Sequence, residues 1–169
     1  MAKQNNPSQM TDFAAHFANE SFAGAANMVE LPDIELMTKD VTASGQGGEF
    51  TVSLKKLKKM SIKAEIENYS SKLLGFIGST EKLSLYGSMN QDGEEIPVKV
   101  VVTADWYKQG TGKGDASSSD IKLPMEGTVR KYELHVDGAE VYYIDINNDI
   151  FRINGVDRFA QKRRNLGSA

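Results

Sequence analysis

The sequence contains no cysteine, which excludes disulfide bonds and thiolate metal sites and is compatible with folding in a reducing cytoplasm. Its two histidines, His16 and His135, are too far apart in the chain for a short zinc-ligand spacing. No apolar run approaches the roughly 18 residues of a membrane-spanning helix. The first 20 residues also lack the apolar core of a signal peptide. We therefore expect a soluble, unprocessed protein without a membrane anchor or a cofactor.

An excess of positive charge is also missing, because the 169 residues carry a formal net charge of -3. A surface that grips nucleic acid normally needs a basic excess, so no broad contact with DNA is expected. Aromatic residues are few, and Trp106 is the single tryptophan. A concave aromatic platform for carbohydrate is therefore not visible in the sequence.

Two short motifs resemble binding sites but lack essential residues. Residues 110–115 (GTGKGD) resemble a phosphate-binding loop, but Tyr107 replaces its first glycine and no Ser or Thr stands at the magnesium position. Residues 145–149 match three ligand positions of a calcium loop, but Ile150 replaces the sharp-turn glycine and the bidentate glutamate is missing. No G-x-S-x-G elbow is present either. We interpret both motifs as polar turns and expect no enzymatic activity.

What the sequence does contain is alternation of polar and apolar residues, which predicts β-strands. Residues 59–67 and 96–107 each alternate strictly. A partner row begins at Leu123 and changes phase at Arg130-Lys131, which predicts a β-bulge. Asp137-Gly138 then predicts a tight hairpin into a strand at 141–146. Two further strands are expected, at 28–37 and 49–53.

Other segments predict loops and two short helices. Residues 38–48 and 109–119 are rich in Gly and Ser and are expected to be flexible hairpin tips. Residues 70–78, with capping serines, Leu73 and Ile77 at helical spacing and a final glycine, predict one short helix. The lysines of residues 55–59 favour a solvated turn or a lysine-guarded strand edge over a membrane-surface helix.

The C-terminal residues 153–167 (INGVDRFAQKRRNLG) predict a turn followed by a basic amphipathic helix. Asn154-Gly155 tolerates positive φ, and Val156, Phe159 and Ala160 share one face at helical spacing. Gly167 is a stop signal behind a basic last turn. At the other end, residues 1–11 are polar and expected to be flexible, which leaves residues 12–169 as a single domain.

Residues 153–167 closely resemble the C-terminal signature of the major tail tube proteins of contractile bacteriophage tails and R-type pyocins. Four upstream stretches resemble the same family in the same order. They are SFAGAANMVELPDIEL (residues 21–36), LYGSM (85–89), EEIPVKVVV (94–102) and KYELHVDGAEVYYID (131–145). Together these stretches span most of the chain from about residue 13, and their order makes the resemblance specific.

The residues alone predict one mainly β domain with long strands whose edges need neighbours. The resemblance implies a β-sandwich or half-barrel with long hairpins, assembled into a hexameric ring with a continuous lumenal β-barrel. Stacked rings would form the inner tube of a contractile tail, a conduit for DNA ejection and envelope penetration. Its implied partners are further copies of itself, the tail sheath, the baseplate and the tail terminator, with genomic DNA passing without specific binding. Its implied location is the virion tail, assembled in the bacterial host cytoplasm.

Strand alternation assigns residues to the two sides of such a wall. The apolar row, expected to lie between the barrel wall and the outer sheet and helix, is Ile62, Ile66, Val98, Val100, Val102, Leu123 and Met125. The opposite row, expected to face the lumen, is Ser61, Lys63, Glu65, Lys99, Thr103, Asp105, Lys122, Glu126 and Thr128. A mixed and partly acidic lining would let DNA slide, because few phosphates could be neutralised at once.

Two further surfaces follow from the resemblance. The family extends a long loop at residues 38–48, so ring-stacking contacts are expected from Thr38, Lys39, Asp40, Gln46 and Glu49. Contacts with another ring or the sheath are expected from Arg158, Phe159, Lys162, Arg163 and Arg164, with the basic side chains exposed.

Three alternatives stay open at this point. The first is the tube protein of a type VI secretion system or of another contractile injection or bacteriocin system. The second is a small β-sandwich carbohydrate-binding or adhesion module, for which the sequence shows no aromatic face. The third is an enzyme, for which it offers no constellation of catalytic residues.

Overall fold

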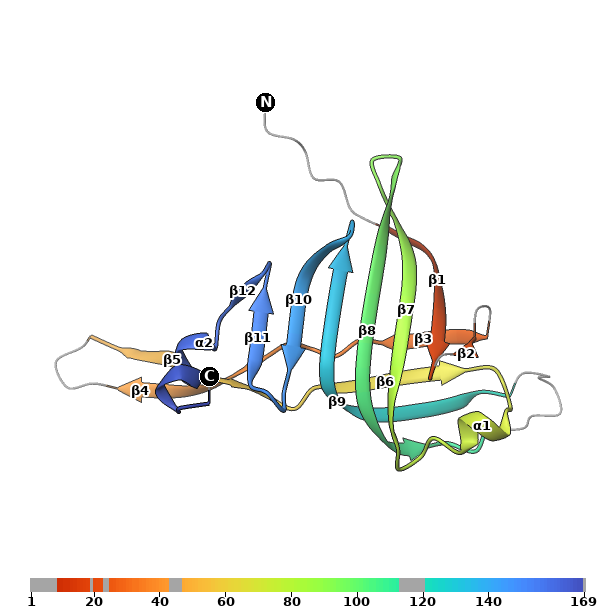
Figure 1. The fold of residues 1–169 in the computed structure, drawn as a ribbon, viewed down its shortest axis with the longest axis horizontal. Helices are drawn as coiled ribbons and strands as arrows, with labels where there is room; N and C mark the ends of the chain where they lie inside the picture. The colour runs from red at the N-terminus through yellow and green to blue at the C-terminus, as the bar shows by residue number, and fades with distance from the viewer. Residues whose placement is uncertain (1–8, 19, 23–24, 43–46, 113–120, 169) are drawn as a thin grey trace.

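The computed structural model describes residues 9–18, 20–22, 25–42, 47–112 and 121–168. Within these residues the chain is mainly β, as predicted, with two short helices. Figure 1 shows a curved sheet with one hairpin extending far from it. The strands are β1 (Gln9–Phe17), β2 (Glu20–Ser21), β3 (Ala26–Glu30), β4 (Leu36–Thr42), β5 (Glu49–Leu57), β6 (Ser61–Ile66), β7 (Thr80–Gln91), β8 (Glu94–Gln109), β9 (Leu123–Val136), β10 (Ala139–Asp145), β11 (Ile150–Ile153) and β12 (Val156–Asp157). The helices are α1 (Ser71–Leu74) and α2 (Ala160–Asn165).

Ten of these strands form one antiparallel sheet in which β9 is shared between two parts. Its order is β12-β11-β10-β9-β8-β7-β1-β2, and β3 and β6 attach to the free half of β9. The first half of β9 pairs with β6 and its second half with β10, while β8 pairs along most of its length. In Figure 1, β3 and β6 run across the direction of β7, β8 and β10. This crossing gives the predicted half-barrel.

The bend lies at the predicted bulge in β9. Lys131 pairs with Thr103 and Val129 with Ala104, so Arg130 is the extra residue. On the near side of the bulge, the Val129 amide donates to the Met60 carbonyl at 2.9 Å, and β9 then changes its partner from β6 to β10. The prediction of a bulge at Arg130-Lys131 is confirmed.

The hairpin between β9 and β10 is also confirmed. Asp137 and Gly138 have φ of +52° and +75°, as a two-residue type I′ turn requires. Helix α1 begins where predicted, with the Ser70 hydroxyl accepting from the Lys72 amide. It spans only four residues, and its second predicted apolar residue, Ile77, lies beyond it and is exposed.

The core fills the concave side of the bent sheet. Six of the seven residues of the predicted apolar row are buried, and Val98 is half-buried. Trp106, 1% exposed, lies 4.9 Å from Phe17 between ring centroids, and Phe17 stacks on Phe76 at 4.8 Å. A buried Trp106 is unavailable for stacking on a sugar, which weakens the adhesion-module alternative.

Several segment boundaries differ from the predictions. The expected strand at 28–37 is two strands, β3 and β4, separated by unpaired residues around Pro32, which has no amide to donate. Residues 38–42, predicted as loop, belong to β4, while residues 43–46 lie outside the described residues. Strand β1 begins at Gln9 and pairs with β7, so residues 9–11, predicted to lie in the polar N-terminal segment, belong to a strand. Most of the predicted loop at 109–119 also lies outside the described residues.

Candidate assembly surfaces

The first candidate surface is the polar face of β6, β8 and β9 near the bend. Residues that pair directly across antiparallel strands share a face. One row joins Ser61, Thr128 and Asp105, and the next joins Lys63 and Glu126. All nine side chains predicted to face the lumen are exposed or half-buried, and they alternate with buried residues. The division into two sides is therefore as predicted, and the lumenal role of the polar side stays a prediction.

Ion pairs and hydrogen bonds fix this polar face. Asp105 accepts from the Thr80 hydroxyl at 2.5 Å and from Arg130 Nε at 2.6 Å. These bonds, the one from Thr80 most of all, outweigh desolvation and lower the pKa of Asp105. The hydroxyl of Tyr107 donates to Glu126 at 2.7 Å and lowers the pKa of that carboxyl. Acidic side chains on this face therefore pair with basic side chains or hydroxyl groups, and the face carries charges of both signs.

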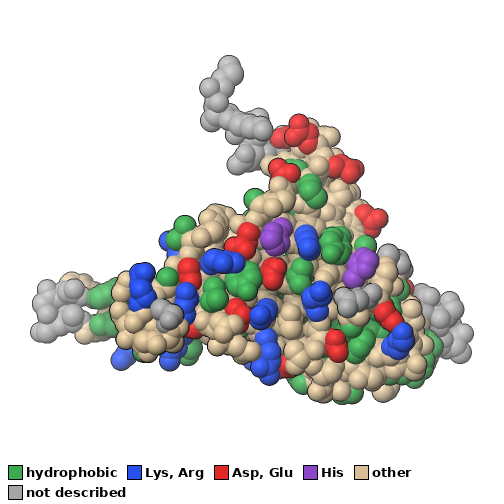
Figure 2. Space-filling model, in the orientation of Figure 1, with side chains coloured by type: hydrophobic (Ala, Val, Ile, Leu, Met, Phe, Trp, Pro, Cys, Tyr) green, Lys and Arg blue, Asp and Glu red, His purple; other side chains and the backbone are tan. Residues whose placement is uncertain are grey.

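The same face continues over the rest of the sheet, where Lys99 and Thr103 are the residues predicted to face the lumen. Tyr86 lies under the Lys99 ammonium at 5.6 Å, and His16 meets its ring edge-on at 5.3 Å. Arg152 lies over the Tyr143 ring at 4.1 Å. Figure 2 shows basic, acidic and histidine side chains interspersed on this face. The missed signal in β7 was alternation of Lys82, Ser84 and Tyr86 with Leu83 and Leu85, although Ser84 itself is buried.

The second candidate surface is the β4–β5 hairpin, which forms its own two-stranded sheet. One face is polar and holds three of the predicted stacking residues, Thr38, Asp40 and Glu49, together with Thr51 and Ser53. The other face carries Met37, Val41, Phe50, Val52 and Leu54, with Lys39 among them. Gln46 lies outside the described residues.

The apolar face of this hairpin is exposed. Phe50 is 46% exposed, Val52 38% and Leu54 45%. A two-stranded hairpin is marginally stable unless its apolar face is covered. Exposed apolar patches of this kind mark interaction sites. The apolar face of the hairpin is therefore a candidate contact surface.

The third candidate surface is the C-terminal segment, where the structure corrects two expectations. Val156 lies in β12 and not on the helix, because Asn154-Gly155 turns the chain back onto β11 with φ of +48° and +78°. It is exposed. Phe159, directly before α2, is buried and lies 5.3 Å from Phe151 between ring centroids. The helix ends at Asn165, and Gly167, with φ of +70°, follows its C-cap residue Leu166 as the predicted stop signal.

The expectation that Lys162 and Arg163 are exposed for a partner is wrong. Lys162 Nζ pairs with Asp149 at 2.6 Å and donates to the Lys55 carbonyl at 3.2 Å. Arg163 pairs with Asp157 at 2.6 Å and donates to the Asp149 carbonyl at 2.9 Å. These acids flank the helix because the turns around β11 bring them there. Arg158 and Arg164 are exposed, so they are the residues of this set most open to a partner.

Arg163 and Arg164 should therefore respond differently to charge reversal. Burial raises the pKa of Asp157, but hydrogen bonds from Arg163 and the Phe159 amide outweigh this and lower it overall. Arg163→Glu removes the hydrogen bonds from Arg163 to Asp157 and to the Asp149 carbonyl and sets two carboxylates together, so we expect a loss of about 1–3 kcal/mol in the free energy of unfolding. Arg164→Glu should cost less than about 0.5 kcal/mol. Urea denaturation of both variants checks this, and equal losses would contradict it.

The structure describes one of the two motifs that resemble binding sites, residues 145–149, in full. Asp145 is buried, accepts from both nitrogens of Asn148 at 3.1 and 2.8 Å, and pairs with Lys131 at 3.1 Å. Its carboxylate therefore anchors a turn. Residues 113–120, which include the second half of the GTGKGD motif at 110–115, lie outside the described residues. Among the residues that the structure describes, no cluster of acidic and histidine side chains is arranged to hold a metal ion, and no helix could span a membrane.

Comparison with known proteins gives three findings. A family model described as phage tail tube protein FII matches residues 7–167. The tail tube protein of Escherichia phage P2 is 27% identical over 161 residues, which cover 87% of this chain and 90% of that protein. A chain in the cryo-EM structure of an extracellular contractile injection system, titled as its PVC sheath/tube terminator in the extended state, superposes with a TM-score of 0.54. It is 16% identical and covers 80% of this chain and 99% of its own, which shows a shared fold.

Proposed function

The chain belongs to the phage tail tube protein FII family, and we propose from this membership that copies of it assemble into the inner tube of a contractile tail. As a tail tube protein it is a structural component of the virion tail. The observation that carries the proposal is the family match over residues 7–167. The exposed apolar hairpin supports it independently, since it requires a partner surface.

Ring formation would use the two ends of the long sheet. At one end, β1 pairs with β7 and contacts β2 only at His16 and Phe17, so most of its outer edge has no neighbour among the described strands. At the other end, the two-residue β12 is the last strand. Joining these different edges between identical subunits is a head-to-tail contact, which closes into a ring. The proposed ring is a hexamer whose joined sheets make one lumenal barrel.

The polar face of the sheet would then line the lumen. Its charges are of both signs and largely paired within the subunit, as Asp105 with Arg130 and Lys131 with Asp145 show. Such a lining offers few free cations to phosphate, so DNA would pass without specific binding. On the outside, the exposed Arg158 and Arg164 are the proposed contacts with the sheath. The baseplate and the tail terminator would bind the two ends of the tube.

Electron microscopy of the purified protein tests this function. We expect rings and stacked tubes of uniform diameter, with a population that grows with protein concentration. Sedimentation velocity on the same samples should show large assemblies in equilibrium with smaller species. A protein that stays monomeric at every concentration would contradict the proposal. The injection-system alternative shares the fold, and the family match favours the phage protein.

A further inference from the structure

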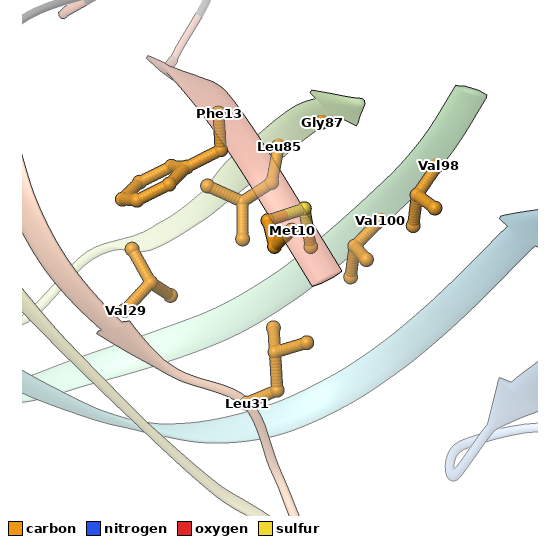
Figure 3. Close-up of a pocket in the computed structure, with 8 residues that line it drawn as sticks. All are labelled: Met10, Phe13, Val29, Leu31, Leu85, Gly87, Val98 and Val100. Carbon is orange, nitrogen blue, oxygen red and sulfur yellow. The ribbon is translucent and has the colours of Figure 1, made fainter. Parts of the chain in front are cut away.

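An apolar pocket opens between β1, β3, β7 and β8 (Figure 3). It measures about 100 Å³, and its walls include Phe13, Val29, Leu85 and Val98. Met10 and Leu31 stand at its rim, 57% and 37% exposed. Gly87 forms part of the wall and keeps the pocket open beside Met10, because a Cβ there would lie 2.7 Å from the Met10 sulfur. The residues that the structure describes therefore cover the concave side of the sheet incompletely at this point.

The exposed apolar face of the β4–β5 hairpin is the natural complement of this pocket, but it belongs to another part of the molecule. Figure 1 shows the hairpin extending from the side that carries α2, while β1 and β7 lie on the opposite side. Its base is held there, because Lys162 binds the Lys55 carbonyl. The hairpin of one subunit therefore cannot fill the pocket of the same subunit.

We propose that Phe50, Val52 and Leu54 of one copy seat against the pocket of a second copy, with Leu31 and Met10 at the contact. This inference rests on the proposed function, because it names the surface that receives the hairpin in the tube. The apolar face of the hairpin and the rim of the pocket are both exposed in the subunit, and this single contact would bury both. The patch and the pocket are different surfaces, so the contact is head-to-tail and repeats from copy to copy.

Charge complementarity supports a second copy as the occupant. Lys39 lies within the apolar face of the hairpin, and Lys55 and Lys56 are exposed at its base. Acidic residues gather at the turn between β7 and β8, where Glu94 and Glu95 lead into the pocket-lining part of β8. Figure 2 shows acidic side chains clustered at this tip of the molecule. Opposite charges at the rim would orient the hairpin as it enters.

Disulfide cross-linking between copies tests the contact cleanly, because the chain has no cysteine of its own. Val52→Cys and Leu31→Cys are made as separate proteins, mixed, assembled into tubes and oxidised. A disulfide needs Cα atoms within about 7 Å, so it reports close approach. The matched control replaces Val52→Cys with Thr51→Cys, which lies on the polar face of the same hairpin. Both pocket and hairpin positions are partly exposed, so the fold should tolerate each change.

The expected result is a covalent dimer from the mixture of Val52→Cys and Leu31→Cys, and several-fold less from the mixture with Thr51→Cys. Tubes that form without a dimer in either mixture would overturn this contact and leave the tail tube function standing. Equal dimer yields from both mixtures would also overturn it, since the apolar face would then have no preference for the pocket. Failure of the unmodified protein to assemble would contradict both this contact and the proposed function.

Discussion

Replacing residues 38–54 with a short Gly-Ser turn is expected to abolish tube assembly and leave the subunit folded. The hairpin pairs only with itself, so its removal breaks no pair in the ten-stranded sheet. It also removes exposed apolar side chains, which should raise the solubility of the subunit. Leu36, Leu57 and the Lys55 carbonyl are retained, so the contact with α2 survives. Sedimentation velocity and electron microscopy should find monomers where the unmodified protein forms tubes.

Point variants separate the loss of the apolar face from the loss of the hairpin itself. Val52→Asp places a carboxylate in the middle of the apolar face, opposite Lys39, and should prevent assembly, because seating the hairpin would bury both charges at a desolvation cost. Ser53→Asp adds the same charge on the polar face, opposite the neutral Thr38, and should assemble almost normally. The free energy of unfolding of both variants should stay within about 1 kcal/mol of the value for the unmodified protein. Normal tubes from Val52→Asp or from the deletion would show that stacking uses another surface.

Much of the sheet could be predicted because its strongest signals are local. Strands β8 and β9 alternate strictly since one side meets the core and the other does not. The type I′ turn at Asp137-Gly138 and the bulge at Arg130 are each determined by a few neighbouring residues. Alternation along these strands also separates the predicted polar row from the core residues. Their positions depend little on the rest of the chain.

The hairpin was mispredicted for a physical reason. Residues 38–42 (TKDVT) contain one apolar residue, and their apolar side is exposed in the subunit, so no core imposes a clear alternation. Residues 38–42 therefore lack the alternation by which a half-buried strand is recognised in sequence. Its pairing with β5 is established only by the tertiary structure, in which Phe50 lies across from Val41 and Val52 across from Lys39.

The C-terminal errors have a different origin. Val156 has the spacing of a helical residue relative to Phe159 and Ala160, but the turn at Asn154-Gly155 commits it to a strand. The ion pairs of Lys162 and Arg163 depend on where the turns around β11 place Asp149 and Asp157. The sequence pattern around a charged residue near a helix end is the same whether that residue contacts a partner or its own chain. Only the tertiary arrangement decides.

Trp106→Ala is expected to cost about 3–5 kcal/mol in the free energy of unfolding, as for large aromatic side chains in a core. Trp106 is 1% exposed and contacts Phe17, and its indole nitrogen donates to the Glu81 carbonyl at 3.4 Å. Alanine would leave a cavity in the middle of the bent sheet and remove this hydrogen bond. For a chain of this length the melting temperature should fall by roughly 10 °C. Differential scanning calorimetry measures this directly.

Tyr107 provides the matched control, because it is adjacent to Trp106 in β8 and is 46% exposed. Tyr107→Ala removes an aromatic ring of similar size and one surface hydrogen bond to Glu126, and should cost less than about 1 kcal/mol. Comparable losses from the two variants would show that the core is not centred on Trp106. If the bend in the sheet depends on this packing, Trp106→Ala should also assemble poorly near its lowered melting temperature and recover on cooling. The Val52→Asp defect should persist at every temperature, because it removes a contact surface and leaves the fold intact.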